Sequence, residues 1–323
     1  MSLTPPGPLV SIGIPTYNRR QFAIRAVRSA LSQTYENIEV IVSDNASTDD
    51  TVQHLSAIRD ARLVILRHQT NTGMVANFNS CLNAATGELF LMLSDDDWLE
   101  PAAIEKLSGP FREPVRGLEP GSVGMTWCPC TNVDAEGKAL WTVRGGPFTE
   151  SPVSLLEGLF NGRRGPVFSA VMIRGEDGRA AGGYNEDRYG ATCDAANWGK
   201  VMLRYENAVC IDEPLVNYTI HSGATSGTSS ASCRNWQLWI NRQVDDFSTV
   251  AREQRDFDGE KRILKCRKNV LANITVTVLM RFKGKPGWVR AFAKEFWRSR
   301  EFMLTPFVAK RIIKDGWKLL RLR

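Results

Sequence analysis

Residues 89–97 read Leu89-Phe90-Leu91-Met92-Leu93-Ser94-Asp95-Asp96-Asp97, an apolar run that ends in three aspartates. The apolar part predicts a short buried strand, and the acidic part predicts the turn that follows it. Carboxylates this close together repel one another, so a site that keeps them ionised normally supplies a cation. Mg²⁺ or Mn²⁺ fits best, because these ions take few protein oxygens and leave coordination positions for substrate phosphates. The alternative is a solvated turn that caps a helix beginning at Pro101.

Strand and helix patterns alternate on the N-terminal side of this turn. Strands are predicted at residues 9–14, 38–42, 63–66 and 89–93, and helices around residues 24–31, 47–58 and 74–85. Such alternation is typical of an α/β fold, with a Rossmann-like, mostly parallel sheet flanked by helices. Polar clusters follow the strands at 16–18, 43–45 and 94–97. Ligands of open α/β sheets bind beyond the carboxyl ends of the strands, so we expect these clusters to converge.

After residue 101 the composition and the predicted secondary structure of the chain change twice. Residues 102–230 are rich in Gly and Pro with short apolar runs, which predicts mixed sheet and loops. From about residue 231 the pattern becomes helical. We therefore divide the chain into an α/β domain at 1–230, with halves at about 1–100 and 101–230, and a helical basic C-terminal region at 231–323.

Positive charge is concentrated near the C-terminus. Residues 261–323 contain 18 of the 41 Lys and Arg residues and 3 of the 35 Asp and Glu residues. Aromatic and basic side chains alternate there at helical spacing, for example Phe292 and Phe296 beside Arg290, Lys294 and Arg298. This composition is typical of helices that lie on an anionic membrane surface. The alternative is a helix packed on the domain with its basic face in solvent.

Other partners and compartments are less well supported. Nucleic acid is not expected, because no stacking-aromatic motif accompanies the basic tail. The N-terminal residues lack a basic stretch followed by an apolar one, and the apolar run at 270–280 is too short to span a bilayer, which needs about 20 residues. Seven cysteines without framework spacing predict neither disulfides nor a zinc site. A cytoplasmic protein, peripheral on the inner face of the membrane, is the prediction.

Several short motifs occur in one order along the first hundred residues. They are Val10-Ser11-Ile12-Gly13-Ile14-Pro15-Thr16-Tyr17-Asn18, Ser29-Ala30-Leu31-Ser32-Gln33-Thr34, Val42-Ser43-Asp44-Asn45-Ala46-Ser47-Thr48-Asp49, Asn71-Thr72-Gly73, Ala85-Thr86-Gly87-Glu88 and Ser94-Asp95-Asp96-Asp97. Over about residues 9–225 the chain thereby resembles the family 2 glycosyltransferases, which have the GT-A fold. The resemblance implies a metal-dependent, inverting hexosyl- or deoxyhexosyltransferase that uses a nucleotide-sugar donor. It also implies a nucleotide-binding half at about 1–100 and an acceptor half at about 101–230.

The resemblance also implies the residues of the donor site. Those that contact the nucleotide are Pro15, Thr16, Tyr17, Asn18, Asp44, Asn71, Gly73 and Asp95. Asp44 would accept a hydrogen bond from a pyrimidine N3–H, which favours UDP or dTDP over GDP; it could instead form an Asx turn. The family's usual Asp-x-Asp begins here with Ser94. On the preferred alignment Asp95 meets the ribose and Asp96 the metal, whereas a one-residue shift would pair Asp95 with Asp97.

The base is implied by a motif farther along the chain. Cys193-Asp194, followed by Trp198, resembles the family's Glu-Asp and Trp, after the turn Gly182-Gly183-Tyr184-Asn185-Glu186. Asp194 would take the proton from the acceptor hydroxyl; Glu186 and Asp187 are the alternative bases, and Asp194 could merely cap a helix. His221 would complete the metal site or be structural.

The expected reaction transfers a sugar to a glycan hydroxyl, on a lipid-linked intermediate of surface-polysaccharide assembly. The loop at 222–232, rich in small residues, is expected to close over the donor. An inactive nucleotide-sugar-binding protein is the alternative function.

Overall fold

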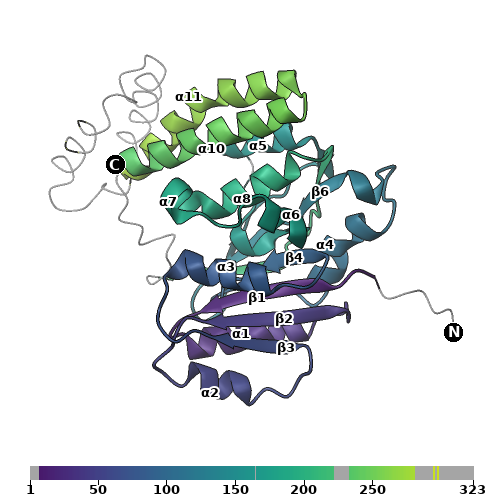
Figure 1. The fold of residues 1–323 in the computed structure, drawn as a ribbon, viewed down its shortest axis with the longest axis vertical. Coiled ribbons are helices and arrows are strands. Elements are labelled where there is room, and N and C mark those ends of the chain that lie inside the picture. The colour runs from purple at the N-terminus through teal and green to yellow at the C-terminus, as the bar shows by residue number, and fades with distance from the viewer. Residues whose placement is uncertain (1–6, 164, 222–232, 281–293, 295–296, 298–323) are drawn as a thin grey trace.

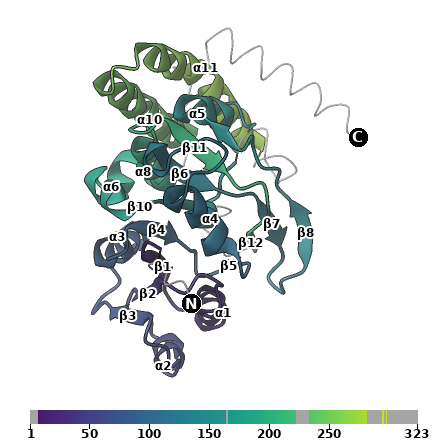
Figure 2. The ribbon, with the colours of Figure 1, turned by 90° about the vertical axis from the view of Figure 1, so that its right-hand side faces the viewer.

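The computed structural model describes residues 7–163, 165–221 and 233–280, together with Lys294 and Trp297. Its main layer is an eight-stranded sheet in the order β3-β2-β1-β4-β10-β6-β11-β9 (Figures 1 and 2). The strands are β1 (Val10–Thr16), β2 (Ile38–Asp44), β3 (Leu63–Arg67), β4 (Leu89–Met92), β6 (Val123–Trp127), β9 (Thr149–Glu150), β10 (Val171–Arg174) and β11 (Asn207–Cys210). The α/β class expected from the alternating pattern is confirmed.

Parallel pairing dominates the N-terminal half of this sheet. β3, β2, β1 and β4 all run in one direction, as the strand–helix alternation predicts. β10 then runs antiparallel to both β4 and β6, while β11 is parallel to β6 and antiparallel to β9. The second half of the sheet is therefore mixed, as the Gly- and Pro-rich middle of the chain indicated.

Helices cover both faces of the sheet. They are α1 (Arg20–Leu31), α2 (Thr51–Ser56), α3 (Met74–Ala84), α4 (Ala103–Arg112), α5 (Pro152–Phe160), α6 (Gly175–Ala180), α7 (Glu186–Tyr189) and α8 (Cys193–Met202). Successive strand side chains point to opposite faces, so Val40 packs in one core with α1 and Ile41 in another with α3. Gly13 allows α3 to lie close to β1, because a Cβ there would lie 2.8 Å from Cβ of Cys81 on α3.

A smaller sheet forms beside the acidic turn. Its order is β5 (Trp98–Leu99), β12 (Val216–Thr219), β7 (Cys130–Val133) and β8 (Ala139–Thr142). β5 begins directly after the third aspartate and pairs antiparallel with β12. This pairing carries the end of β12, and with it His221, to the acidic turn.

Two long helices, α10 (Cys233–Glu253) and α11 (Phe257–Met280), pack against α5, α7 and α8 (Figure 1). Val244, Phe247 and Ile263 share a buried core with Met125 and Trp127 of β6. This part of the C-terminal region therefore packs on the core. The aromatic and basic motif around residues 290–298, apart from Lys294 and Trp297, and the chain beyond it lie outside the described residues.

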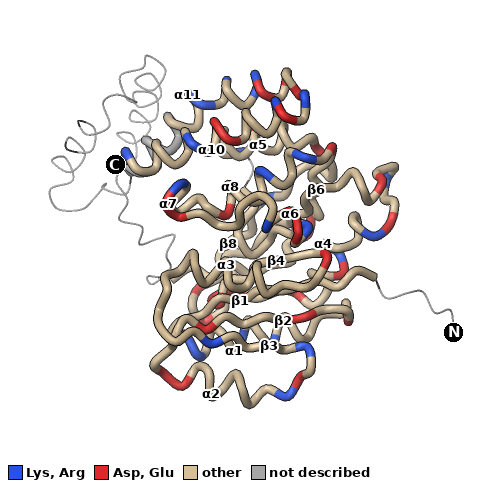
Figure 3. The backbone as a smooth tube through the Cα atoms, viewed as in Figure 1, with Lys and Arg blue, Asp and Glu red and all other residues tan. Residues whose placement is uncertain are grey.

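Charge on the described helices is mixed. Figure 3 shows basic and acidic residues interspersed along α10 and α11. Most of the excess of Lys and Arg noted in residues 261–323 follows residue 280. Within the described ranges, no helix combines the length and the apolar composition needed to cross a bilayer.

Candidate active site

A pocket of about 660 Å³ lies where β1, β2 and β4 end. Seven of the residues expected at the site line it, namely Pro15, Thr16, Tyr17, Asn71, Asp95, Asp96 and Asp194. The three polar clusters converge as expected. Thr16 Oγ1 donates to Asp95 Oδ2 at 2.8 Å, and the backbone N–H of Asn45 donates to the carbonyl of Thr16.

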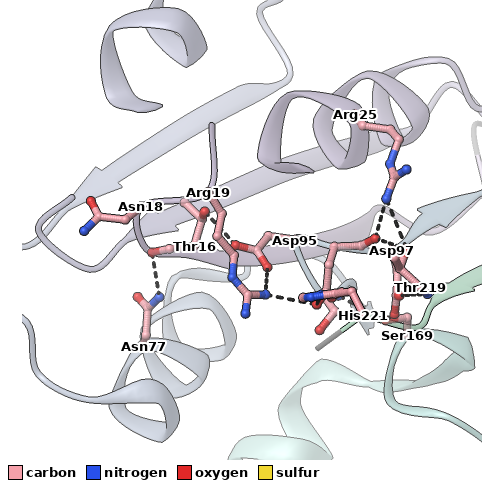
Figure 4. Close-up of polar contacts among 12 residues, drawn as sticks. Thr16, Asn18, Arg19, Arg25, Asn77, Asp95, Asp97, Ser169, Thr219 and His221 are labelled. Carbon is pink, nitrogen blue, oxygen red and sulfur yellow. Dashed lines mark hydrogen bonds and ion pairs between the residues drawn. The ribbon is translucent and has the colours of Figure 1, made fainter. Parts of the chain in front are cut away.

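The aspartates of the turn differ in their surroundings, and Figure 4 shows Asp95 beside Arg19 and Asp97 beside Thr219. Asp95 and Asp96 line the pocket. Asp97 is only 1% exposed and accepts hydrogen bonds from Ser169 Oγ at 2.6 Å and from the backbone N–H of Thr219 at 2.8 Å. Asp97 thus ties the turn to β12 and to η2 (Phe168–Ala170). The shifted pairing of Asp95 with Asp97 would need a carboxylate that points away from the pocket.

Burial affects the protonation of Asp95 and Asp97. Burial raises the pKa of Asp95 to about 6, although the charge of Arg19 acts in the opposite direction. Burial, helped by the negative charge of Asp96, raises the pKa of Asp97 to about 8. A desolvated carboxylate favours its neutral form unless a cation is near. The turn is therefore a site where added positive charge would be strongly favoured.

Arg19 supplies positive charge at this turn, and the sequence did not single it out. Its Nη1 lies 3.1 Å from Asp95 Oδ1 and 2.9 Å from Asp96 Oδ2. Arg19 directly precedes α1 and lines the pocket. The one local feature that could have indicated a role for Arg19 is its position immediately after the polar cluster at 16–18.

Arg25, also missed, holds the turn from the other side. Its Nη2 donates to the carbonyl of Asp96 at 2.6 Å and to Thr219 Oγ1 at 3.1 Å. Its guanidinium lies 3.9 Å from the centre of the Trp98 ring, in stacking contact. One side chain on α1 thereby fastens both the acidic turn and β12.

His221 lies at the end of β12, next to the acidic turn. Its Nε2 is 2.9 Å from Asp96 Oδ2, and its ring stacks on Phe22 with centroids 5.3 Å apart. The expected pair of Asp96 and His221 is therefore in contact. Across the described ranges, no group of three or more His, Cys, Asp or Glu side chains has a metal-binding arrangement. The loop at 222–232 lies outside the described residues.

Asp44 ends β2 and is fully buried. Its Oδ2 accepts from the backbone N–H of Ser47 at 3.1 Å, which is the Asx-type turn that the sequence offered as an alternative. Its Oδ1 has no hydrogen-bond partner among the described residues. A buried acceptor left unpaired costs free energy. Asp44 thus forms the turn through Oδ2, and its Oδ1 can still accept a hydrogen bond.

The other residues expected at the nucleotide organise loops beside the pocket. Asn45 Nδ2 donates to Asn71 Oδ1 at 3.0 Å and to the carbonyl of Gly73 at 3.1 Å. Gly73 has φ +91, a conformation that side chains rarely adopt, and precedes α3. Asn18 accepts from the backbone N–H of Thr48 at 2.8 Å and is not among the pocket-lining residues. Asn18 therefore clamps the loop after β2.

Asp194 approaches the same pocket from a different part of the chain. It lies in the first turn of α8, and burial raises its pKa. The N-cap of α8 is Thr192, and Asp194 follows it by two positions. Glu186 and Asp187 sit on α7, are exposed and do not line the pocket. Of the three candidate bases, Asp194 alone faces the pocket.

α10 contributes to this side of the site, which the sequence did not indicate. Trp236 lines the pocket. Gln243, 1% exposed, donates through Nε2 to the carbonyl of Thr192 at 2.6 Å and to Thr192 Oγ1 at 2.7 Å. Thr192 is the residue before α8, two positions from Asp194. The C-terminal helices therefore help to set the position of the candidate base.

An acidic pocket at the carboxyl ends of a Rossmann-like sheet, with a second small sheet beside it, defines the GT-A class of transferase folds. Solved structures agree in fold. The S. aureus protein TarS, residues 1–349 in complex with UDP-GlcNAc, superposes with a TM-score of 0.61 at 14% identity, covering 95% of this chain and 92% of that one. The Pyrobaculum calidifontis mannosyltransferase PcManGT, in complex with GDP-Man and Mn²⁺, gives a TM-score of 0.50 at 17% identity, covering 97% and 88%.

The chain belongs to glycosyl transferase family 2, whose sequence model matches residues 11–120. An uncharacterized protein of Mycobacterium tuberculosis is 30% identical over 247 residues, which cover 72% of this chain and 74% of that protein. The E. coli enzyme WfaP, named as a UDP-Glc:alpha-D-GlcNAc-diphosphoundecaprenol beta-1,3-glucosyltransferase, is 40% identical over 90 residues. That match covers 28% of this chain and 36% of WfaP. The chain thus spans only about a third of this relative's length.

Proposed function

We propose that this protein transfers a sugar from a nucleoside-diphosphate donor to a hydroxyl of a glycan acceptor. The observation that carries the proposal is that one pocket is lined by both the acidic pair Asp95 and Asp96 and the partly buried carboxylate of Asp194. The first two suit a donor diphosphate and its cation, and the third suits proton removal from an acceptor. A site for binding alone would need no carboxylate of raised pKa on a separate element.

The proposed mechanism is a single displacement with inversion. Asp194 takes the proton of the acceptor hydroxyl as its oxygen attacks the anomeric carbon, and the bond to the nucleoside diphosphate breaks. Burial raises the pKa of Asp194, which makes it a stronger base than an exposed aspartate. No covalent intermediate is needed.

Asp96 and His221 suit a Mg²⁺ or Mn²⁺ ion. Their contacting atoms lie 2.9 Å apart, and an oxygen and a nitrogen are both acceptable ligands for Mn²⁺. Two protein ligands are enough for an ion that takes its remaining ligands from phosphates and water. When bound, the ion would neutralise charge on the departing diphosphate. Thr16 and Asp95, joined by a hydrogen bond, would remain to contact the ribose.

UDP or dTDP is the favoured nucleotide. The free oxygen of Asp44 can accept the N3–H of uracil or thymine. Because Asp44 is fully buried, the base must displace the residues that cover it. The acceptor is proposed to be a lipid-linked glycan, in line with the name of the E. coli relative WfaP. The basic C-terminal residues would then hold the enzyme peripherally on the anionic inner face of the membrane.

Ligand-dependent thermal stability tests the proposal first. UDP and dTDP, each with Mn²⁺, should raise the melting temperature, whereas GDP should raise it less. The matching donor should then release free UDP or dTDP when a diphosphate-linked glycan is added, as measured by a coupled nucleotide assay. The proposal fails if no nucleotide stabilises the protein. Stabilisation without any release, across a panel of acceptors, would instead indicate an inactive binding protein.

A further inference from the structure

Arg19 pairs with both pocket-facing aspartates, and Figure 4 shows its contact with Asp95. A single nitrogen, Nη1, lies within 3.1 Å of Asp95 Oδ1 and 2.9 Å of Asp96 Oδ2. The Arg19 side chain is 29% exposed, whereas those of the two aspartates are 8% and 12% exposed. The guanidinium thus reaches from the pocket to a largely buried acidic pair and offsets part of its negative charge.

The same carboxylate oxygen serves two groups. Asp96 Oδ2 contacts Nη1 of Arg19 and also Nε2 of His221, both at 2.9 Å. A divalent cation held by Asp96 and His221 would need that oxygen and would stand within a few ångströms of the guanidinium. Like charges at such separation repel strongly in a partly buried site. Arg19 and the cation therefore compete for one place.

If the cation displaces Arg19 from the aspartates, the diphosphate of a bound donor can become its new partner. Among the described residues that line it, Arg19 is the only Lys or Arg. The diphosphate of a donor brings two or more negative charges into that space, and guanidinium pairs well with phosphate through two parallel hydrogen bonds. The donor can thus supply the hydrogen bonds that Arg19 gives up at Asp95 and Asp96.

We propose that Arg19 is the resident counterion of the Asp95–Asp96 pair and exchanges with the divalent cation when the donor diphosphate binds. The inference rests on the proposed function and adds a binding role for Arg19. Without diphosphate, Arg19 holds the acidic pair and weakens cation binding. With diphosphate, Arg19 pairs with phosphate oxygens and the cation takes its place. Cation and nucleotide then strengthen each other's binding by the same factor, as linkage requires.

Mn²⁺ binding without nucleotide tests the exchange directly, because it needs no catalysis. Free Mn²⁺ is measured by electron paramagnetic resonance in titrations of the wild type and Arg19→Gln. Removing a charged hydrogen-bonding competitor should tighten Mn²⁺ binding by about tenfold. Arg19→Lys, which keeps the charge, should stay near the wild type. Arg20→Gln is the matched control, because Arg20 pairs with Asp50 and does not line the pocket.

Nucleotide binding gives the second readout. In Arg19→Gln, UDP or dTDP binding in the presence of Mn²⁺ should weaken by about tenfold, since a charged phosphate contact is lost. The mutual strengthening of Mn²⁺ and nucleotide should shrink in the same variant. The exchange is refuted if Arg19→Gln binds Mn²⁺ alone no more tightly than the wild type. If the wild type binds no nucleotide while Arg19→Gln still tightens Mn²⁺, the proposed function fails and the counterion role stands.

Discussion

Single residues of the acidic turn differ because their neighbours differ. Asp95 and Asp96 share Arg19, whereas Asp97 accepts from Ser169 and from the backbone of Thr219. Burial raises the pKa of Asp95 and of Asp97. Identical side chains in consecutive positions thus acquire a ligand-facing role or a structural one through hydrogen bonding and burial.

Asp194→Asn tests the base at the residue scale. The variant should lose at least about a hundredfold in kcat, the usual contribution of a general base. Nucleotide affinity should not change, because the amide occupies nearly the same volume. Asp96→Ala should show the opposite pattern, with weakened Mn²⁺-dependent nucleotide binding. Steady-state kinetics and calorimetry measure the two effects, and near-wild-type turnover of Asp194→Asn would remove Asp194 as the base.

The pH dependence of turnover tests the environment of the same residue. The base must be ionised, and burial raises the pKa of Asp194 above its ordinary value near 4. Activity should therefore disappear, as pH falls, at a higher pH than an exposed aspartate would allow. A pH profile of kcat measures this limb. An acid limb at or below pH of about 4 would contradict the burial argument.

At the scale of elements, the segment that carries Asp194 is held by α10. Gln243 bonds both the carbonyl and the hydroxyl of Thr192, and Asp246 accepts from Arg188 and from Tyr189 OH. These contacts fasten α7 and the turn before α8 to one helix. A base on a short helix needs such support, because small displacements of a reacting group cost much of the rate.

Gln243→Leu tests this support. The change removes both hydrogen bonds that Gln243 donates to Thr192, which should cost about 1–3 kcal/mol of stability. We expect kcat to fall about tenfold or more while KM for the donor stays constant, because Gln243 donates its hydrogen bonds to Thr192, beside the base, and not to a donor-site residue. Kinetics and urea unfolding measure the two effects.

Ser248→Ala is the control for this variant. Ser248 is buried on the same helix, but among the described residues its hydroxyl donates only to the carbonyl of Asp245, on its own helix. Its kcat should match that of the wild type. A purely structural role for Gln243 would give lower stability with kcat unchanged in both variants.

At the scale of the whole molecule, the C-terminal helices belong to the same body as the sheet. Phe247 and Ile263 are buried against β6, and Trp236 of α10 lines the pocket. The region from residue 233 to the end of α11 therefore serves folding and the site. The proposed membrane contact is assigned to the basic residues after residue 280.

Two truncations separate these roles. A chain ending at residue 232 should not fold, because it exposes apolar residues of β6 and α5 that α10 and α11 cover. A chain ending at residue 280 should fold and bind nucleotide as the full chain does. It should lose binding to vesicles of anionic lipid, at about 1 kcal/mol per basic residue removed from the surface. Melting curves and vesicle sedimentation measure these outcomes, and unchanged sedimentation would refute the membrane role.

The strand–helix order and the acidic turn were legible in the sequence. Hydrophobic periodicity and turn residues act over a few positions, so the run at 89–97 and the alternation before it could be read directly. The convergence of the polar clusters could be predicted because ligands of open α/β sheets bind beyond the carboxyl ends of the strands. The candidate base at Asp194 came from resemblance, since nothing local distinguishes its carboxylate from those of Glu186 and Asp187.

The partners of these residues could not be read from the chain. Arg19 and Asp96 are separated by 77 positions, and Gln243 and Thr192 by 51. The packing of distant elements decides which cation pairs with a buried carboxylate and which helix supports a base. Such packing produces no periodic pattern in the sequence. Local patterns therefore specified the sheet and the acidic turn, whereas the folded chain assigned Asp97 to structure, Arg19 to the cation position and α10 to the site.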